Sequence, residues 1–206
     1  RRPGLSLPPA LRYPAYRSYW FGTLGSVIGF QMLNASLFWL VHSLENSPIY
    51  LGYVGLANGI PAIGLNLFGG VLADKLNMQR LITATQSISA ILIFLLATLT
   101  LLGWVQVWHV LAISFAAGAV NAFDQPARQA LYPHLIDRKV MMSAVALDSA
   151  IWGGTRIIAP ALAGMIIAVA GSAISIYVAG LGFVIMAFVI YTLKVPDIER
   201  ATAGNN

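Results

Sequence analysis

Gly69-Gly70-Val71-Leu72-Ala73-Asp74-Lys75-Leu76-Asn77-Met78-Gln79-Arg80 is the stretch that decides the fold of this chain. It places a compact charged turn between two long apolar runs, at about residues 50–73 and 80–103. Other short connections between apolar runs, such as Glu45-Asn46-Ser47-Pro48 and Gly171-Ser172, carry almost no charge. Two such runs joined by a short turn predict two helices that meet at one surface of a membrane. The concentration of charge in this turn predicts a functional role for it.

The composition indicates that lipid surrounds most of the chain. Its 206 residues are 58% hydrophobic and only 9% charged, whereas a soluble domain carries roughly a quarter charged residues. The net charge of +5 does not predict a nucleic-acid partner, because the basic residues lie between apolar runs and not on a stripe with aromatic residues. The chain contains no cysteine, which excludes a thiolate metal site, and we expect neither a cofactor nor a bound metal.

Six apolar segments are long enough to span the hydrocarbon core of a bilayer, which takes about 20 residues in a helix. They lie at about 18–43, 50–73, 80–103, 105–127, 141–169 and 172–194. The short connections leave no room for a soluble domain, so the sequence predicts an all-α membrane protein with one six-helix domain over residues 18–194. Residues 1–17 are expected to form a cytoplasmic segment, and residues 195–206 the start of a cytoplasmic linker.

The lysines and arginines predict the orientation of the six segments. All of them except Arg156 lie before the first segment, after the sixth, or in the connections that follow the second and the fourth. The connections after the first, third and fifth segments contain none. Both ends of the chain are therefore expected on the cytoplasmic side of the cell (inner) membrane.

A short internal similarity suggests a repeat. Pro61-Ala62-Ile63-Gly64 in the second segment resembles Pro160-Ala161-Leu162-Ala163-Gly164 in the fifth, and each segment is the middle one of a three-segment unit. The two units begin on opposite sides of the membrane, as in the inverted repeats of many transporters. The sequence therefore predicts a 3+3 inverted repeat.

A second charged cluster, Phe123-Asp124-Gln125-Pro126-Ala127-Arg128-Gln129-Ala130, closes the fourth segment on the same side of the membrane. The four-residue spacing of Asp124 and Arg128 puts them on one face of a helix, although Pro126 can bend it. A charged loop can also serve only to fix the topology. With two acid/base clusters on one membrane face, we favour a charge network that acts as a cytoplasmic gate and contains Gly70, Asp74, Arg80, Asp124 and Arg128.

These clusters carry a family resemblance. Gly70-Val71-Leu72-Ala73-Asp74-Lys75 with Arg80 resembles the signature loop between helices 2 and 3 of major facilitator superfamily transporters. Residues 123–130, with Arg156-Ile157-Ile158-Ala159-Pro160-Ala161-Leu162-Ala163-Gly164, are similar to the efflux permease branch that contains the enterobactin exporter. The resemblance covers about residues 12 to 195. It implies the N-terminal half of a twelve-helix fold, whose partner is a C-terminal six-helix half of the same full-length chain or a second copy.

The signature loop departs from the family pattern at two places. The family usually has glycine at the position of Asn77 and a basic pair at Met78-Gln79. Asparagine tolerates a left-handed turn, so the loop can keep its shape, but its charge network is thinner. In the family, the acid that matches Asp74 braces the cytoplasmic gate against a helix of the other half.

Charged and amide residues inside the apolar segments are candidates for a substrate cavity. Arg156 lies near the middle of the fifth segment, where a basic residue costs about 3 kcal/mol or more unless it faces water, protein or a partner. It either attracts an anionic substrate or forms a structural pair. Asp148, two helical turns earlier on a similar face, is the intramembrane candidate for proton coupling. Each intramembrane amide either lines the cavity or bonds a neighbouring helix: Gln31, Asn34, Asn58, Asn66, Gln86 and Asn121.

The favoured interpretation is a secondary active transporter that exports small molecules, such as siderophores or drug-like compounds, by alternating access. The first and fourth segments, with parts of the second and fifth, would line the cavity, and Pro160 with Gly164 would let the fifth helix bend. The alternative is a six-span membrane scaffold or assembly subunit without transport activity. No segment combines a serine with a nearby histidine or a pair of acids, so the sequence does not predict an enzyme.

Overall fold

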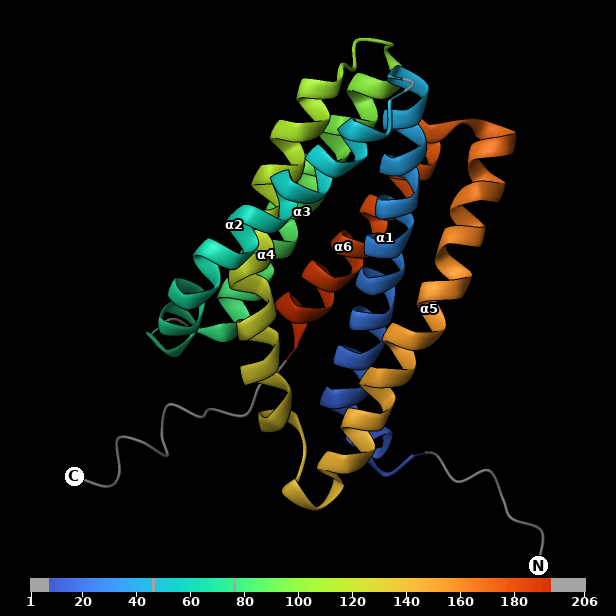
Figure 1. Cartoon of the computed structure of the whole chain (residues 1–206). Coiled ribbons are helices and arrows are strands. Elements are labelled where there is room, and N and C mark those ends of the chain that lie inside the picture. Colours follow the sequence, from blue (N-terminus) through green and yellow to red (C-terminus); the bar gives the residue numbers. More distant parts are fainter. Residues whose placement is uncertain (1–7, 46, 76, 194–206) are drawn as a thin grey trace, which may run out of the picture.

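The computed structural model describes residues 8–45, 47–75 and 77–193, and of residues 66–75 it describes the helical backbone only. This part of the chain forms a bundle of six α-helices without strands (Figure 1). They are α1 (Pro14–Leu44), α2 (Pro48–Lys75), α3 (Met78–Leu101), α4 (Val107–Leu131), α5 (Met141–Ala170) and α6 (Ser172–Thr192). All six are long and apolar enough to cross a membrane, which confirms the predicted segments and the all-α fold class.

Local sequence signals begin and end these helices. Proline occupies the first position of α1 and α2, where its missing N–H costs nothing. The side chain of Asn77 accepts a hydrogen bond from the backbone N–H of Arg80 at 3.1 Å and caps the start of α3. Gly171, with φ of +87°, makes the turn between α5 and α6, because such a backbone favours glycine.

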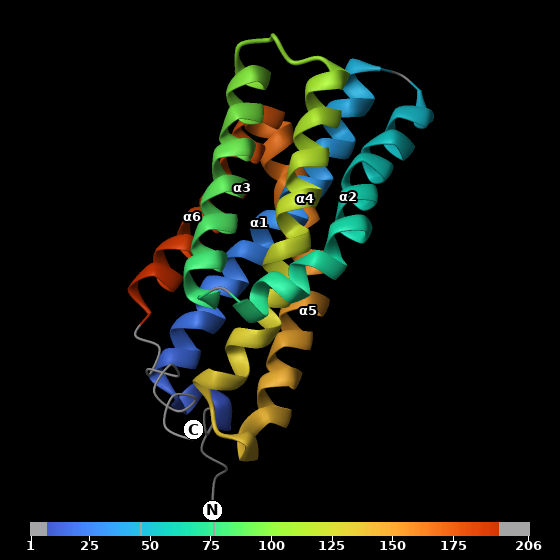
Figure 2. The same cartoon turned by 90° about the vertical axis from the view of Figure 1, so that its left-hand side faces the viewer.

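The helices pack in a pattern that confirms the 3+3 inverted repeat. The edge helix α2 packs mainly against α4, and the edge helix α5 mainly against α1; the two lie at opposite sides of the bundle (Figure 1). The contact of α1 with α6 corresponds to that of α4 with α3. The third helices of the two units, α3 and α6, pack against each other. Exchanging α1, α2 and α3 with α4, α5 and α6 leaves these pairs unchanged. Figure 2 shows α4 between α2 and α3.

Glycines let two helix pairs approach closely, α1 with α6 and α2 with α4. A Cβ placed on Gly29 of α1 would overlap the backbone oxygen of Ala179 in α6, and one on Gly182 would overlap that of Gly25. A Cβ on Gly118 of α4 would overlap the backbone oxygen of Asn58 in α2. In lipid, where no hydrophobic force drives helices together, such close packing is a main source of association.

Hydrogen bonds between side chains also join neighbouring helices. The buried hydroxyls of Ser36 in α1 and Ser175 in α6 lie 2.8 Å apart. Near the other end of α6, the Nε2 of Gln79 donates to the backbone oxygens of Ile190 at 2.6 Å and Leu193 at 2.8 Å. The last carbonyls of a helix lack partners within it. Gln79, one of the family departures, thus binds the start of α3 to the end of α6.

The two edge helices keep one face uncovered. A Cβ placed on any of their glycines in the described part would meet nothing within 4 Å, namely Gly52, Gly55, Gly59 and Gly64 in α2 and Gly153, Gly154 and Gly164 in α5. Large apolar residues accompany them, with Ile63 79% and Ile157 78% exposed. Packing among the described residues therefore does not account for these glycines.

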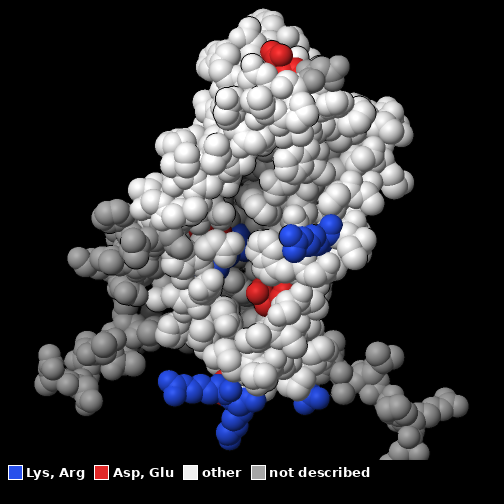
Figure 3. Space-filling model, in the orientation of Figure 1, with Lys and Arg blue, Asp and Glu red and all other residues white. Residues whose placement is uncertain are grey.

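Charge is unevenly distributed over the surface. Figure 3 shows basic side chains gathered at the end of the molecule where the turn between α4 and α5 lies. Arg138 and Lys139, in the short 3-10 helix η3 (Arg138–Val140), are exposed there. The long sides of the bundle are mostly uncharged, as a lipid-facing surface requires.

Candidate transport cavity

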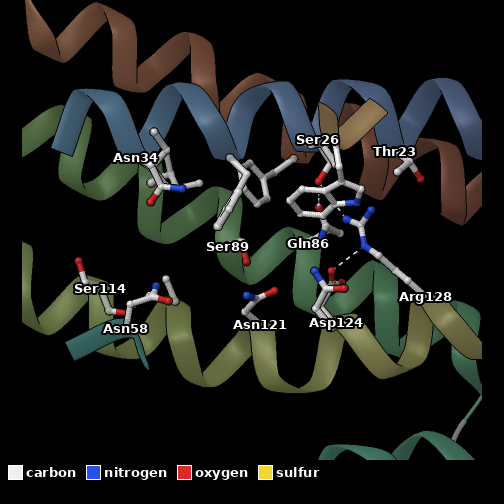
Figure 4. A pocket seen from close by; sticks show the side chains of 18 of the residues that line it. Thr23, Ser26, Asn34, Asn58, Gln86, Ser89, Ser114, Asn121, Asp124 and Arg128 are labelled. Atoms are coloured by element: carbon white, nitrogen blue, oxygen red, sulfur yellow. Dashed lines mark hydrogen bonds and ion pairs between the residues drawn. The ribbon is translucent and has the colours of Figure 1, made fainter. Parts of the chain in front are cut away.

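A cavity of about 210 Å³ lies between the helices. All six helices contribute to its lining, including α3 and α6, which the sequence interpretation left out. Its polar lining residues come from five helices: Thr23, Ser26 and Asn34 (α1), Asn58 (α2), Gln86 and Ser89 (α3), Ser114, Asn121, Asp124, Gln125, Arg128 and Gln129 (α4) and Asp148 (α5). Figure 4 shows that these groups divide into a charged end and a neutral end.

The charged end is built around a buried ion pair. The Nε of Arg128 donates to Oδ2 of Asp124 at 2.6 Å, and the two side chains are 11% and 7% exposed. Asp124 and Arg128 therefore lie on one face of α4, as their spacing predicts, and α4 continues through Pro126. Thr85 of α3 donates to Oδ1 of Asp124 at 2.6 Å. Both oxygens of the Asp124 carboxylate are thus hydrogen-bonded.

A chain of hydrogen bonds extends this pair to α1 and α3. Nη2 of Arg128 donates to the hydroxyl of Ser26 at 2.9 Å, and that hydroxyl donates to Oε1 of Gln86 at 3.0 Å. The charged end therefore links three helices, of which α1 and α4 are related by the repeat. Buried charges are tolerated only when they are paired and hydrogen-bonded in this way.

The neutral end contains amides and a hydroxyl. Asn34, Asn58 and Ser114 lie together at the opposite end of the cavity from Arg128 (Figure 4). The amide of Asn58 donates to the backbone oxygen of Ser114 at 3.4 Å, which joins α2 to α4. Ser114 is 3% exposed, and its hydroxyl has no hydrogen-bond partner among the described residues. Such a group is satisfied by water or by a ligand.

The four residues expected at the cavity separate into two pairs. Asn34 and Asp148 line it, whereas Gln31 and Arg156 do not. Eight residues of a helix at 3.6 residues per turn rotate the side chain by about 80°. Arg156 therefore lies on a different face of α5 from Asp148 and is exposed. The cavity-facing residue one turn after Asp148 is Trp152.

Of the other predicted positions, Arg80, Pro160 and Gly164 do not line this cavity. Gly70 and Asp74 fall in the part of α2 of which only the backbone is described, and Arg80 is exposed at the start of α3. The gate that would connect them to Asp124 and Arg128 therefore stays a prediction. Pro160 and Gly164 lie within α5, which continues through both; the bend remains a prediction too. In the described part, no group of three or more metal-ligating side chains is close enough to hold an ion.

Sequence reasoning did not single out the small hydroxyls of this site. Ser26, Thr85 and Ser114 are ordinary residues in a membrane helix, where their hydroxyls usually bond the backbone. One signal was available in α4, because Ser114, Asn121 and Arg128 recur every seven residues. That period puts them on one helical face.

Comparison with known proteins agrees with this architecture. The family model described as Transmembrane secretion effector matches residues 6–203. The Staphyloferrin A transporter of Staphylococcus aureus (strain NCTC 8325 / PS 47) is 33% identical over 147 residues, which are 71% of this chain but only 36% of that protein. No solved structure matches the chain. A match over nearly the whole sequence, on six membrane-length helices in an inverted repeat, shows that the chain belongs to the Transmembrane secretion effector family of major facilitator superfamily transporters.

Proposed function

We propose that this chain is the N-terminal half of a secondary active transporter that exports small molecules from the cytoplasm by alternating access. The observation that carries the proposal is the polar cavity around the buried pair of Asp124 and Arg128. Taking two ions out of water costs several kcal/mol each before their attraction is counted. A six-span scaffold without transport activity needs no such cavity inside the membrane.

The partner in this proposal is a second six-helix bundle, either the C-terminal half of the full-length protein or a second copy. The uncovered faces of α2 and α5 support a second bundle, because their residues are small or apolar and the two helices flank this bundle on both sides. The cavity would then lie between the two bundles near the midplane, as in other transporters built from repeats. Both ends of this half would face the cytoplasm of a cell (inner) membrane.

Two further assignments belong to the same proposal. Asp148 is the acid for proton coupling, because it lines the cavity and makes no ion pair with a described residue. Gly70, Asp74 and Arg80 would form the cytoplasmic gate with Asp124 and Arg128. The relative named Staphyloferrin A transporter supports a siderophore as the cargo.

Cysteine accessibility in the full-length protein tests alternating access, and this chain has no native cysteine to remove. Ser89→Cys and Asn121→Cys each place a thiol in the cavity. We expect a membrane-impermeant thiol reagent to label them from either side of the membrane, in proportions that change with an imposed proton gradient. Phe188→Cys, on the exposed face of α6, is the lipid-facing control and should stay unlabelled. Labelling of the cavity thiols from one side only, under every condition, would favour the scaffold.

A further inference from the structure

We propose that the charged end of the cavity is a carboxylate-binding subsite, in which Arg128 and Gln86 receive a carboxylate of the transported molecule. The inference rests on the proposed transport function and names the chemical class of its substrate. It assigns to Arg128 the attraction for an anion that the sequence suggested for Arg156.

Arg128 offers donors that the chain itself does not use. Its Nε binds Asp124 and one hydrogen of Nη2 binds Ser26. A guanidinium has five N–H donors in a planar fork, and the remaining ones have no acceptor among the described residues. Because Arg128 lines the cavity while its side chain is only 11% exposed, a molecule in the cavity can supply an acceptor for these donors.

Gln86 presents further donors at the same place. Its Oε1 accepts from Ser26, whose hydroxyl is already committed as the acceptor for Arg128. This order of donors and acceptors leaves the Nε2 of Gln86 without an acceptor in the described part, on a residue that is 2% exposed. Figure 4 shows Gln86 and Arg128 close together at the charged end. Donors from two helices thus meet at one spot.

A carboxylate fits this spot better than a cation or a neutral group. Its two oxygens match the fork of a guanidinium, and hydrogen bonds between ions are about twice as strong as neutral ones. Asp124, with both oxygens engaged by Arg128 and Thr85, holds the guanidinium in place and does not block its other edge. Asp124 and Asp148 repel an incoming carboxylate, so removing either charge should strengthen binding.

The neutral end indicates what the remainder of such a molecule carries. Asn34, Asn58 and the unpartnered hydroxyl of Ser114 form hydrogen bonds without adding charge. They suit hydroxyl or amide groups, and leaving them unpaired would be costly. The expected substrate is therefore a polar organic acid with hydroxyl or amide groups at some distance from the carboxylate.

Binding of succinate and its diamide, succinamide, to the purified full-length protein tests the subsite by calorimetry. The two probes have nearly the same shape and differ in charge. We expect succinate to bind at least about tenfold more tightly, which corresponds to about 1.4 kcal/mol. Arg128→Gln should abolish this preference and Arg128→Lys should reduce it, since lysine lacks the planar fork.

Two matched variants separate recognition from a structural role. Asp124→Asn keeps a hydrogen-bonding side chain next to Arg128 but removes its charge, so succinate should bind more tightly by about threefold or more. Arg156→Gln removes an arginine that does not line the cavity and should leave binding unchanged. Gel filtration checks that each variant is folded.

Equal affinity for the two probes would overturn the subsite, and so would weaker binding of succinate by Asp124→Asn. If the cavity thiols still show access from both sides, the transport function stands and only the substrate class is wrong. If the cavity thiols are accessible from one side only, the proposed transport function is wrong as well as the substrate class.

Discussion

Two groups of glycines that look alike in the sequence have opposite surroundings in the bundle. Gly29, Gly118 and Gly182 let backbones of α1, α4 and α6 touch their neighbours, so that no side chain fits. The glycines named above for α2 and α5 have no described residue within reach of an added Cβ. Glycine content in a membrane helix therefore does not identify its packed face. The first group lets the helices of this bundle pack closely. Under the proposed function, the second group forms the surface against which a second bundle packs.

The largest effect is expected from Gly29→Val, compared with Gly55→Val. Both changes make the same substitution in a helix, but only the first forces a side chain into the backbone of Ala179. We expect Gly29→Val to destabilise this six-helix half by about 3 kcal/mol and Gly55→Val to leave its unfolding temperature nearly unchanged. Thermal unfolding in detergent measures both, and equal effects would refute the distinction between the two groups.

A smaller effect is expected from Gly118→Ala, compared with Gly59→Ala. The single methyl group at Gly118 would meet the backbone of Asn58 and push α2 away from α4. The loss should be about 2 kcal/mol, read from the same unfolding experiment. Gly59→Ala should be neutral or slightly stabilising, because alanine favours a helix over glycine.

The hydrogen bond between Ser36 and Ser175 joins α1 to α6, the two helices that Gly29 also brings together. Ser36→Ala leaves the other hydroxyl buried without a partner and should cost about 1–2 kcal/mol. The double variant with Ser175→Ala should cost less than the single one, since no polar group is then left unpaired. A double-mutant cycle of unfolding free energies decides, and additive losses would show that the bond is not made.

The smallest effect on stability is expected on the uncovered faces. Gly55→Leu and Gly154→Leu should change the free energy of unfolding of this half by less than about 0.5 kcal/mol, because nothing described lies against them. In the full-length protein they should nevertheless reduce transport, since a leucine would keep a second bundle at a distance. Transport at the level of the unchanged protein would mean that lipid covers these faces.

The sequence predicted the helices well because apolar runs of this length have only one stable structure in a bilayer. Six segments, their order and the inverted repeat follow from hydropathy, charge and one short similarity. The pair of Asp124 and Arg128 was also predictable, because both residues lie on the same helix at a spacing that brings them together.

The remainder of the cavity could not be predicted in the same way. Ser26, Thr85 and Gln86 meet Arg128 and Asp124 from other helices, and hydropathy does not say how helices are rotated about their axes. Arg156 differs from these residues, because its position about 80° around the same helix from Asp148 follows from their eight-residue spacing and could be read from the sequence. Asn58 and Gln86 each bond a neighbouring helix and also line the cavity, so the two alternatives left open for the amides do not exclude each other.

The hydrogen bonds from Gln79 to the end of α6 differ in kind from the contact that a basic residue would make there. A basic side chain, usual at this position in the family, would hold a helix end through an attraction that dissolved salt and phospholipid headgroups weaken. The amide of Gln79 carries no charge, so the strength of its hydrogen bonds does not depend on ionic strength or on the lipid species around it. The start of α3 and the end of α6 are therefore held together in the same way in every membrane that the protein enters.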